Sequence, residues 1–140
     1  NIPVVVHIIL GLPGESRETV LRTIDYLNRL PIQGVKLQLL HVLSDSDLAD
    51  LYRAGEYTPL EKEEYLTLVG DCIAHLRADI VLHRLTGDGD KNTLLAPLWS
   101  LRKRDVLNHL HRYLRENHIR QGMSCKIDLS VIYNKPKDVL

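Results

Sequence analysis

The chain begins with an apolar run at residues 4–10, followed by a Gly-Leu-Pro-Gly turn and a polar segment from Ser16. The run is short and rich in β-branched side chains, which predicts a strand in the middle of a parallel sheet that is covered on both faces. Ser16 is a favourable N-cap for a helix. The helix predicted after it presents one apolar stripe, made of Val20, Leu21, Ile24, Leu27 and Leu30.

Two further strand-like runs follow, at residues 35–42 and 80–84. The first of them alternates between apolar and polar positions in its early half, which is typical of a strand with one partly polar face. A helical segment separates each strand from the next, and this order implies right-handed crossovers between parallel strands. We therefore expect an α/β fold with two or three parallel strands.

Helical periodicity accounts for much of the remaining chain. A short helix is predicted from Asp47, and a long one from a capping box at residues 58–61, where Pro59 would take the first helical position. The last clear helix covers residues 101–118. Beyond it, residues 127–131 alternate like an edge strand, and a mobile tail fits the same residues equally well.

Composition indicates a soluble globular protein, with 44% hydrophobic and 26% charged residues. No apolar run approaches the roughly 20 residues that a membrane-spanning helix needs. No basic segment precedes the first apolar run, which argues against a secretory signal. Cys72 and Cys125 lack metal-ligand spacing and are typical of reduced thiols, so we expect a cytoplasmic protein with no membrane partner.

The net charge of zero conceals an asymmetry between two parts of the chain. Residues 1–100 carry 9 Lys and Arg against 14 Asp and Glu, whereas residues 101–140 carry 9 against 4. A basic segment of this kind can meet the phosphates of RNA. It can equally be a solvated helix face and tail, which is the simpler interpretation.

The turn at Gly11-Leu12-Pro13-Gly14 joins a strand to a helix, which is where parallel α/β proteins bind ligands. Glycines let a ligand approach the backbone closely, and a helix N-terminus offers free N–H groups. The glycine spacing matches neither a Walker loop nor the dinucleotide fingerprint. The sequence therefore leaves a binding loop and a plain tight turn equally open.

Polar side chains lie on or after each predicted strand. His7, His41 and His83 could line a pocket, but no accompanying carboxylate or cysteine spacing supports a metal centre, and we expect no metal site. Arg84 could clamp a carboxylate or phosphate, and Asp88 could accept a hydrogen bond from a substrate hydroxyl. Alternatively, these two side chains pair with each other and brace a surface loop. Their place at the end of a strand favours the functional interpretation.

Several segments together resemble one protein family. Residues 7–15 resemble the fifth-strand motif of radical S-adenosylmethionine (SAM) enzymes. Residues 39–43, 83–89 and 96–100 resemble the YhcC-type family, which is related to oxygen-independent coproporphyrinogen oxidase and to the catalytic subunit of Elongator. The likeness covers roughly residues 1–122.

The resemblance implies the carboxyl-terminal part of a partial (β/α)6 radical SAM barrel, with a helical extension after it. In such enzymes a [4Fe–4S] cluster on a CxxxCxxC loop reduces SAM to a 5′-deoxyadenosyl radical, which abstracts a hydrogen atom from the substrate. This sequence contains no CxxxCxxC, and it opens on a strand without an initiator Met. We therefore expect a fragment that is inactive alone, while the parent chain is an iron–sulfur oxidoreductase.

The resemblance also implies roles for particular residues. The residues that it implies for contacts with the SAM adenosine are His7, Ile9, Gly11, Leu12, Pro13, Leu40, His41 and Val42. The residues that it implies for the substrate side of the site are His83, Arg84 and Asp88. Because relatives of this family modify wobble uridines of tRNA, tRNA is a candidate substrate.

On this interpretation residues 1–90 belong to the barrel, residues 91–122 form the helical extension, and residues 123–140 are a tail, an edge strand or a disordered segment. Two alternatives stay open, a self-sufficient nucleotide-binding α/β domain and a non-enzymatic module that docks RNA or a protein. The strand at residues 4–10 has no partner before it, and we expect its apolar edge to cause self-association.

Overall fold

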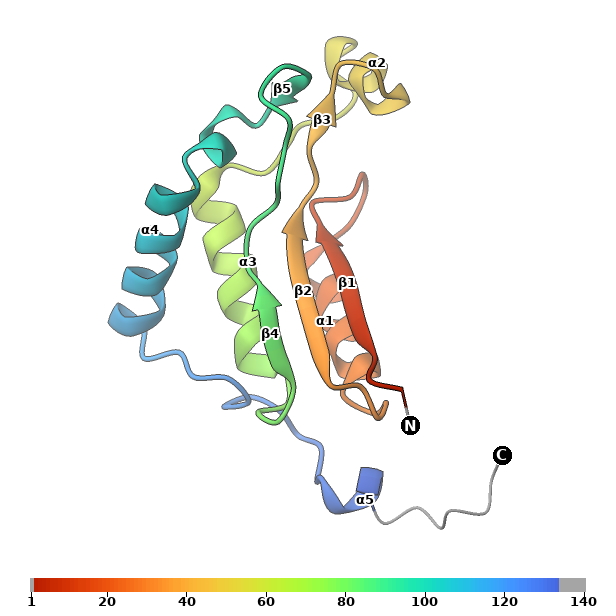
Figure 1. The fold of residues 1–140 in the computed structure, drawn as a ribbon, viewed down its shortest axis with the longest axis vertical. Coiled ribbons are helices and arrows are strands. Elements are labelled where there is room, and N and C mark those ends of the chain that lie inside the picture. The colour runs from red at the N-terminus through yellow and green to blue at the C-terminus, as the bar shows by residue number, and fades with distance from the viewer. Residues whose placement is uncertain (1, 134–140) are drawn as a thin grey trace.

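A three-stranded parallel sheet forms the centre of the computed structural model, which describes residues 2–133 (Figure 1). The strands β1 (Val5–Leu10), β2 (Gly34–Leu39) and β4 (Val81–Arg84) lie in the order β1-β2-β4. β1 and β2 run in continuous register from one end to the other. This sheet confirms the α/β fold with parallel strands that the sequence predicts.

Three helices cover one face of the sheet. In Figure 1, α1 (Arg17–Leu27) and α3 (Lys62–His75) lie behind the strands, and α4 (Lys103–Glu116) packs beside α3. Each helix contributes an apolar stripe to one core, so the burial of this face is the main source of stability. Its members include Ile8, Leu10, Ile24, Leu27, Val35, Leu37, Leu39, Leu66, Val69, Ile73, Val106 and Leu110.

The other face of the sheet is open in the part of the chain that the structure describes. Val5 and Ile9 point to this face and keep 37% and 42% of their surface exposed, whereas Ile8 and Leu10 are buried. The sequence predicts that a strand of this kind is covered on both faces in a whole sheet and that its edge is exposed in this chain, and within the described residues β1 is covered on one face only. β1 is an edge strand, because within residues 2–133 it pairs with β2 alone.

The predicted second strand divides into two short strands that belong to different sheets. β2 ends at Leu39, and β3 (Val42–Leu43) pairs antiparallel with β5 (Leu94–Ala96), a strand that the sequence pattern did not reveal. α2 (Asp47–Arg53) follows β3 and helps to enclose a second, smaller core. That core consists of Val42, Ala49, Tyr57 and Ala96.

Two helix boundaries differ from the predicted ones. α3 begins at Lys62, after the N-cap Glu61. Its capping box therefore joins Glu61 to Glu64, and not residue 58 to Glu61 as predicted. The predicted helix at residues 101–118 corresponds to α4, which begins two residues later, at Lys103. A separate 3-10 turn, η1 (Leu98–Leu101), precedes it. The helical extension packs on the same core as the sheet, through Val106 and Leu110.

The chain after α4 returns to the end of α3. The N–H of Gly122 donates to the carbonyl of Ile73, and the N–H of Ser124 donates to the carbonyl of Ala74. A short helix, α5 (Ser130–Tyr133), then stands where the sequence allowed an edge strand, so that alternative is wrong for residues 127–131. The rest of the predicted tail, residues 134–140, lies outside the described residues.

Candidate functional site

The turn after β1 is made of backbone that favours glycine. Gly11 and Gly14 have φ angles of +94° and +72°, both in the left-handed region. The N–H of Glu15 donates to the carbonyl of Leu12 and closes the turn. Ser16 Oγ then accepts from the N–H of Thr19, which confirms Ser16 as the N-cap of α1.

Two side chains from the segment before α3 hold this turn from behind. The hydroxyl of Tyr57 donates to the carbonyl of Gly11 at 2.7 Å. The Leu60 side chain packs so closely that a Cβ on Gly11 would lie only 3.2 Å from it. Burial raises the pKa of Glu15, and a hydrogen bond from the N–H of Gly11 partly offsets that effect. The turn is therefore rigid, and Tyr57 gave no local signal in the sequence because the contact joins residues 46 positions apart.

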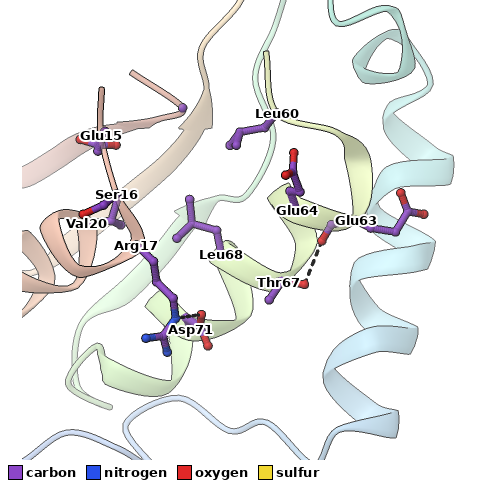
Figure 2. Close-up of a pocket in the computed structure, with 11 residues that line it drawn as sticks. Glu15, Ser16, Arg17, Val20, Leu60, Glu63, Glu64, Thr67, Leu68 and Asp71 are labelled. Atoms are coloured by element: carbon purple, nitrogen blue, oxygen red, sulfur yellow. Dashed lines mark hydrogen bonds and ion pairs between the residues drawn. The ribbon is translucent and has the colours of Figure 1, made fainter. Parts of the chain in front are cut away.

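An acidic groove lies on the helical side of the same turn. It has a volume of about 450 Å³ and runs between α1 and α3 (Figure 2). Arg17 Nε meets Asp71 Oδ2 at 2.6 Å within it, while Glu15, Glu63 and Glu64 also line it. Negative charge beside the first turn of α1 repels phosphate, so this helix N-terminus is a poor phosphate site. The alternative of a phosphate-binding nucleotide domain loses its main support.

The open face of the sheet carries a row of polar side chains. His7 of β1 is in register with Lys36 of β2, and Ile9 is in register with Gln38. His83 of β4 lies on this face too, because its ring occupies the space where a Cβ on Gly34 would project. Lys36 and Gln38 were not among the predicted site residues, although the alternation within residues 35–39 marks both of them as lying on a polar face.

His41 has a defined tautomer at the end of β2. Its Nε2 lies 3.1 Å from Ser100 Oγ, whose own proton is donated to the carbonyl of Pro97. The Nε2 atom is therefore the donor, and Nδ1 is left as an acceptor. Burial lowers the pKa of His41, with a smaller effect from the Lys103 charge, so the ring is neutral at pH 7. Gly87 packs directly against the ring.

The other residues predicted to contact SAM differ in their exposure. Leu12 is 42% exposed and Pro13 is exposed, whereas Leu40 is half-buried against the second core. Val42 is fully buried inside that core and has no surface to offer a ligand. Val42 therefore supports the site by packing, and the sequence could not show this because its partner strand begins 52 residues later, at Leu94.

The residues predicted for the substrate side lie in two places. His83 is on the open face, whereas Arg84 pairs with Asp88 at 2.8 Å. Asp88 also pairs with Lys103 at the start of α4, so this network braces the loop at residues 86–90 against the helix. The geometry realises the loop-bracing alternative, and a substrate role for Arg84 and Asp88 stays a prediction.

Two features of residues 2–133 bear on the class of site. Within them, no group of three His, Cys, Asp or Glu side chains is placed to hold a metal ion. No helix in the same part of the chain has the length and apolar character to span a membrane.

Comparison with known proteins identifies the family. Residues 32–116 match the Radical_SAM C-terminal domain. This chain belongs to that family. The match includes β2, β4 and α4, and the turn at Gly11 lies before it.

Proteins similar to this chain occur in bacteria and archaea. The chain is 34% identical to the uncharacterized protein YtqA of Bacillus subtilis (strain 168), over 83% of this chain and 36% of that protein. It is also 34% identical to YhcC of Escherichia coli (strain K12), over 81% of this chain and 37% of that protein. The chain thus spans little more than a third of these relatives, which confirm the predicted likeness to the YhcC-type family.

A solved structure with a similar fold is archaeal Elp3 of Methanocaldococcus infernus with an amino-terminal deletion. The TM-score is 0.70 over 85% of this chain and 28% of that chain, at 17% sequence identity. At this identity the likeness concerns the fold alone. It confirms the predicted relation to the carboxyl-terminal part of a radical SAM fold.

Proposed function

We propose that this domain serves a radical SAM enzyme by forming the wall that binds the adenosine part of SAM. The observation that carries the proposal is the turn at Gly11, which is rigid, accessible and flanked by the exposed side chains of Ile9 and Leu12. It stands at the carboxyl edge of a parallel sheet in a chain of this family, where ligands of α/β proteins bind.

The residues at this edge fit a nucleoside. Ile9 and Leu12 offer apolar surface to a base, and Gly11 lets the backbone approach the ligand closely. The Gln38 side chain can donate and accept hydrogen bonds beside Ile9, and the neutral His41 offers a fixed acceptor at Nδ1. When bound in the whole protein, a [4Fe–4S] cluster and SAM supply the hydrogen-abstracting radical chemistry.

This chain's own part in that function is to bind and orient. The Tyr57 and Leu60 contacts keep the Gly11 turn in one conformation, which lowers the entropic cost of ligand binding. The contact between His41 and Ser100 fixes the imidazole in one tautomer. Lys36 and His83 give the open face a polar surface for a substrate.

We further propose that the substrate is an RNA, with tRNA as the candidate. The resemblance to tRNA-modifying relatives and the excess of basic residues in positions 101–140 support this proposal. The non-enzymatic alternative, a module that only docks RNA or a protein, shares the basic segment but gives no role to the Gly11 turn.

The test uses the full-length protein, purified without oxygen, and measures bound iron, SAM affinity and 5′-deoxyadenosine formation. Ile9→Ala removes apolar surface beside the turn, and we expect about tenfold weaker SAM binding. Val5→Ala is the matched control, because Val5 lies on the same face of β1 but far from the turn. Equal effects of the two substitutions would contradict the adenosine wall. A wild-type protein that forms no 5′-deoxyadenosine would overturn the radical SAM proposal.

A further inference from the structure

The outer face of α4 carries a line of polar and basic side chains, which we call the α4 stripe. It consists of Arg104, Asn108, His111 and Arg115, all exposed and spaced so that they share one side of the helix. The stripe is about 16 Å long at 1.5 Å per residue. The apolar side of the same helix, with Val106 and Leu110, is buried against the core.

The carboxylates near the start of α4 are already paired. Asp105 meets Lys62 Nζ at 2.7 Å, and Asp88 is held by Arg84 and Lys103. The basic residues of the stripe differ in this respect. Within residues 2–133, no carboxylate lies within ion-pair distance of Arg104 or Arg115. The stripe therefore presents uncompensated positive charge.

A broad basic hollow continues the stripe beyond the helix N-terminus. It has a volume of about 700 Å³ and is lined, within residues 2–133, by Lys91, Leu101, Arg102, Lys103, Arg104, Asn108 and Asp105, whose carboxylate is the one acidic group there and is already paired with Lys62. Lys91 and Arg102 also take part in no ion pair among the described residues. The positive end of the α4 dipole points into the same region and adds to the attraction for an anion.

We propose that the α4 stripe and this hollow dock the phosphate backbone of the substrate RNA. The inference rests on the proposed function, since it assumes that the substrate is an RNA. Two arginines with the polar residues Asn108 and His111 between them suit a polyanion, and such contacts position a nucleic acid without reading its sequence. The stripe has no apolar side chain at its centre, which a protein interface normally has. The helix cannot insert into a lipid surface, because its apolar side is buried.

The docking surface lies next to the candidate site. Lys103 at the start of α4 pairs with Asp88, which belongs to the loop at residues 86–90. Gly87 of that loop packs on His41. An RNA backbone held by α4 would therefore present its neighbouring nucleotides to the end of the sheet where His41 lies.

The experiment measures tRNA binding by the full-length protein as a function of salt, using filter binding. The double variant Arg104→Gln/Arg115→Gln removes two phosphate contacts. The slope of log K against log salt is negative, and we expect its magnitude to decrease by about 1.4. At 0.1 M salt this corresponds to binding that is weaker by on the order of 25-fold. The matched control is Arg22→Gln/Arg29→Gln, which removes one exposed arginine of α1 and one just after it and should leave the slope unchanged.

The outcomes separate this inference from the proposed function. SAM cleavage to 5′-deoxyadenosine without RNA is measured on every variant, and circular dichroism establishes that each is folded. A loss of tRNA binding in the α4 variant alone, with SAM cleavage retained, supports the inference. The inference is overturned by unchanged tRNA binding in the α4 variant, by an equal loss in the control, or by no tRNA binding in the wild type. None of these outcomes contradicts the radical SAM proposal, which is tested by SAM cleavage. Binding to vesicles of anionic lipid in place of tRNA would also overturn it.

Discussion

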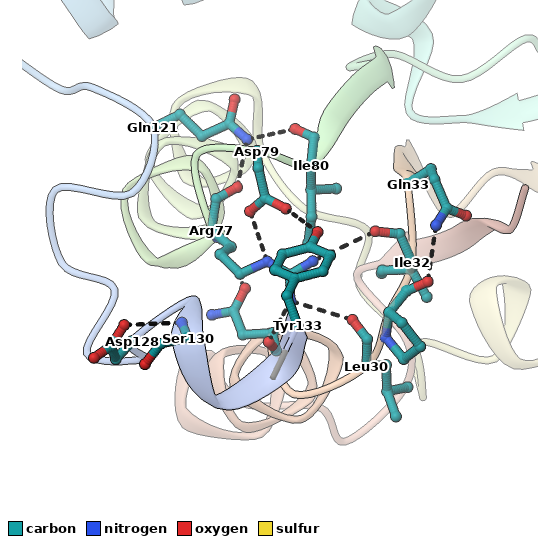
Figure 3. A network of polar contacts seen from close by, with 12 residues as sticks. Leu30, Ile32, Gln33, Arg77, Asp79, Ile80, Gln121, Asp128, Ser130 and Tyr133 are labelled. Carbon is teal, nitrogen blue, oxygen red and sulfur yellow. Dashed lines mark hydrogen bonds and ion pairs between the residues drawn. The ribbon is translucent and has the colours of Figure 1, made fainter. Parts of the chain in front are cut away.

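Arg77 is the largest buried side chain, with only 2% of its surface exposed, and it joins segments that are far apart in the chain (Figure 3). Its guanidinium donates to the carbonyls of Asn28, Leu30 and Ile32, at 2.7, 3.2 and 3.4 Å. It also pairs with Asp79 at 2.7 Å. These carbonyls belong to the connection between α1 and β2, so Arg77 fixes how the chain leaves the helix.

We expect Arg77→Met to be strongly destabilising. The substitution keeps apolar volume but leaves buried carbonyls without a donor, and the free energy of unfolding should fall by about 3 kcal/mol. Urea denaturation of the protein measures this loss. Arg22→Met, at an exposed position of α1, is the control and should change stability by less than about 0.5 kcal/mol. A loss below about 1 kcal/mol for Arg77→Met would show that water replaces the guanidinium.

The two cysteines should differ sharply in reactivity. Cys72 is fully buried, and burial raises its pKa to about 12, whereas Cys125 is partly exposed. At pH 8 the thiolate fraction of Cys72 is on the order of one in ten thousand. We expect one fast thiol in a disulfide-exchange assay of the native protein, and none in Cys125→Ser. Fast reaction in Cys125→Ser would contradict this burial, and denaturant should expose both thiols in the wild type.

At the residue scale, the sequence could indicate chemistry but not partners. Arg84 and Asp88 have the right charges for a substrate and also for each other, and the deciding neighbour, Lys103, lies 15 residues further along the chain. The tautomer of His41 likewise depends on Ser100, which sequence reasoning did not assign to the site. Contacts of this kind depend on tertiary packing, so no local pattern contains them.

At the scale of elements, the turn between β1 and α1 gives a matched pair of substitutions. Gly11→Ala and Gly14→Ala both force alanine into the left-handed region, at about 1–2 kcal/mol each. A methyl group on Gly11 would also lie 3.2 Å from Leu60, whereas nothing lies within 4 Å of one on Gly14. We therefore expect the larger loss of stability in urea denaturation for Gly11→Ala. Equal losses would mean that the Leu60 side chain moves aside without a further loss of stability.

The element boundaries show which patterns are local. The strand β1, the N-cap at Ser16 and the helix after it follow from short-range signals, and the structure confirms them. The start of α3 does not follow from short-range signals, because a capping box fits both residues 58–61 and residues 61–64. The structure selects the second, since Trp99 donates to the carbonyl of Leu60 and the Leu60 side chain packs behind Gly11. Long-range contacts therefore decide this boundary.

At the scale of the whole molecule, β1 presents a free edge. The carbonyls of Val4 and Leu10 accept from Gly34 and Leu40, so the even-numbered residues of this strand bond to β2. The N–H and C=O groups of the odd-numbered residues, with His7 at the middle, point to the other side. Within residues 2–133 no strand pairs there, and an apolar edge of this kind attracts another strand.

We propose that this chain, taken by itself, associates through that edge. His7→Pro removes a donor from the free side and keeps every bond to β2, so it should block strand pairing without unfolding the sheet. Sedimentation equilibrium over a range of concentrations should show dimers for the wild type and for the control His7→Ala, and monomers for His7→Pro. A wild-type chain that stays monomeric at high concentration would contradict the proposal. Dimers of His7→Pro would place the contact on another surface.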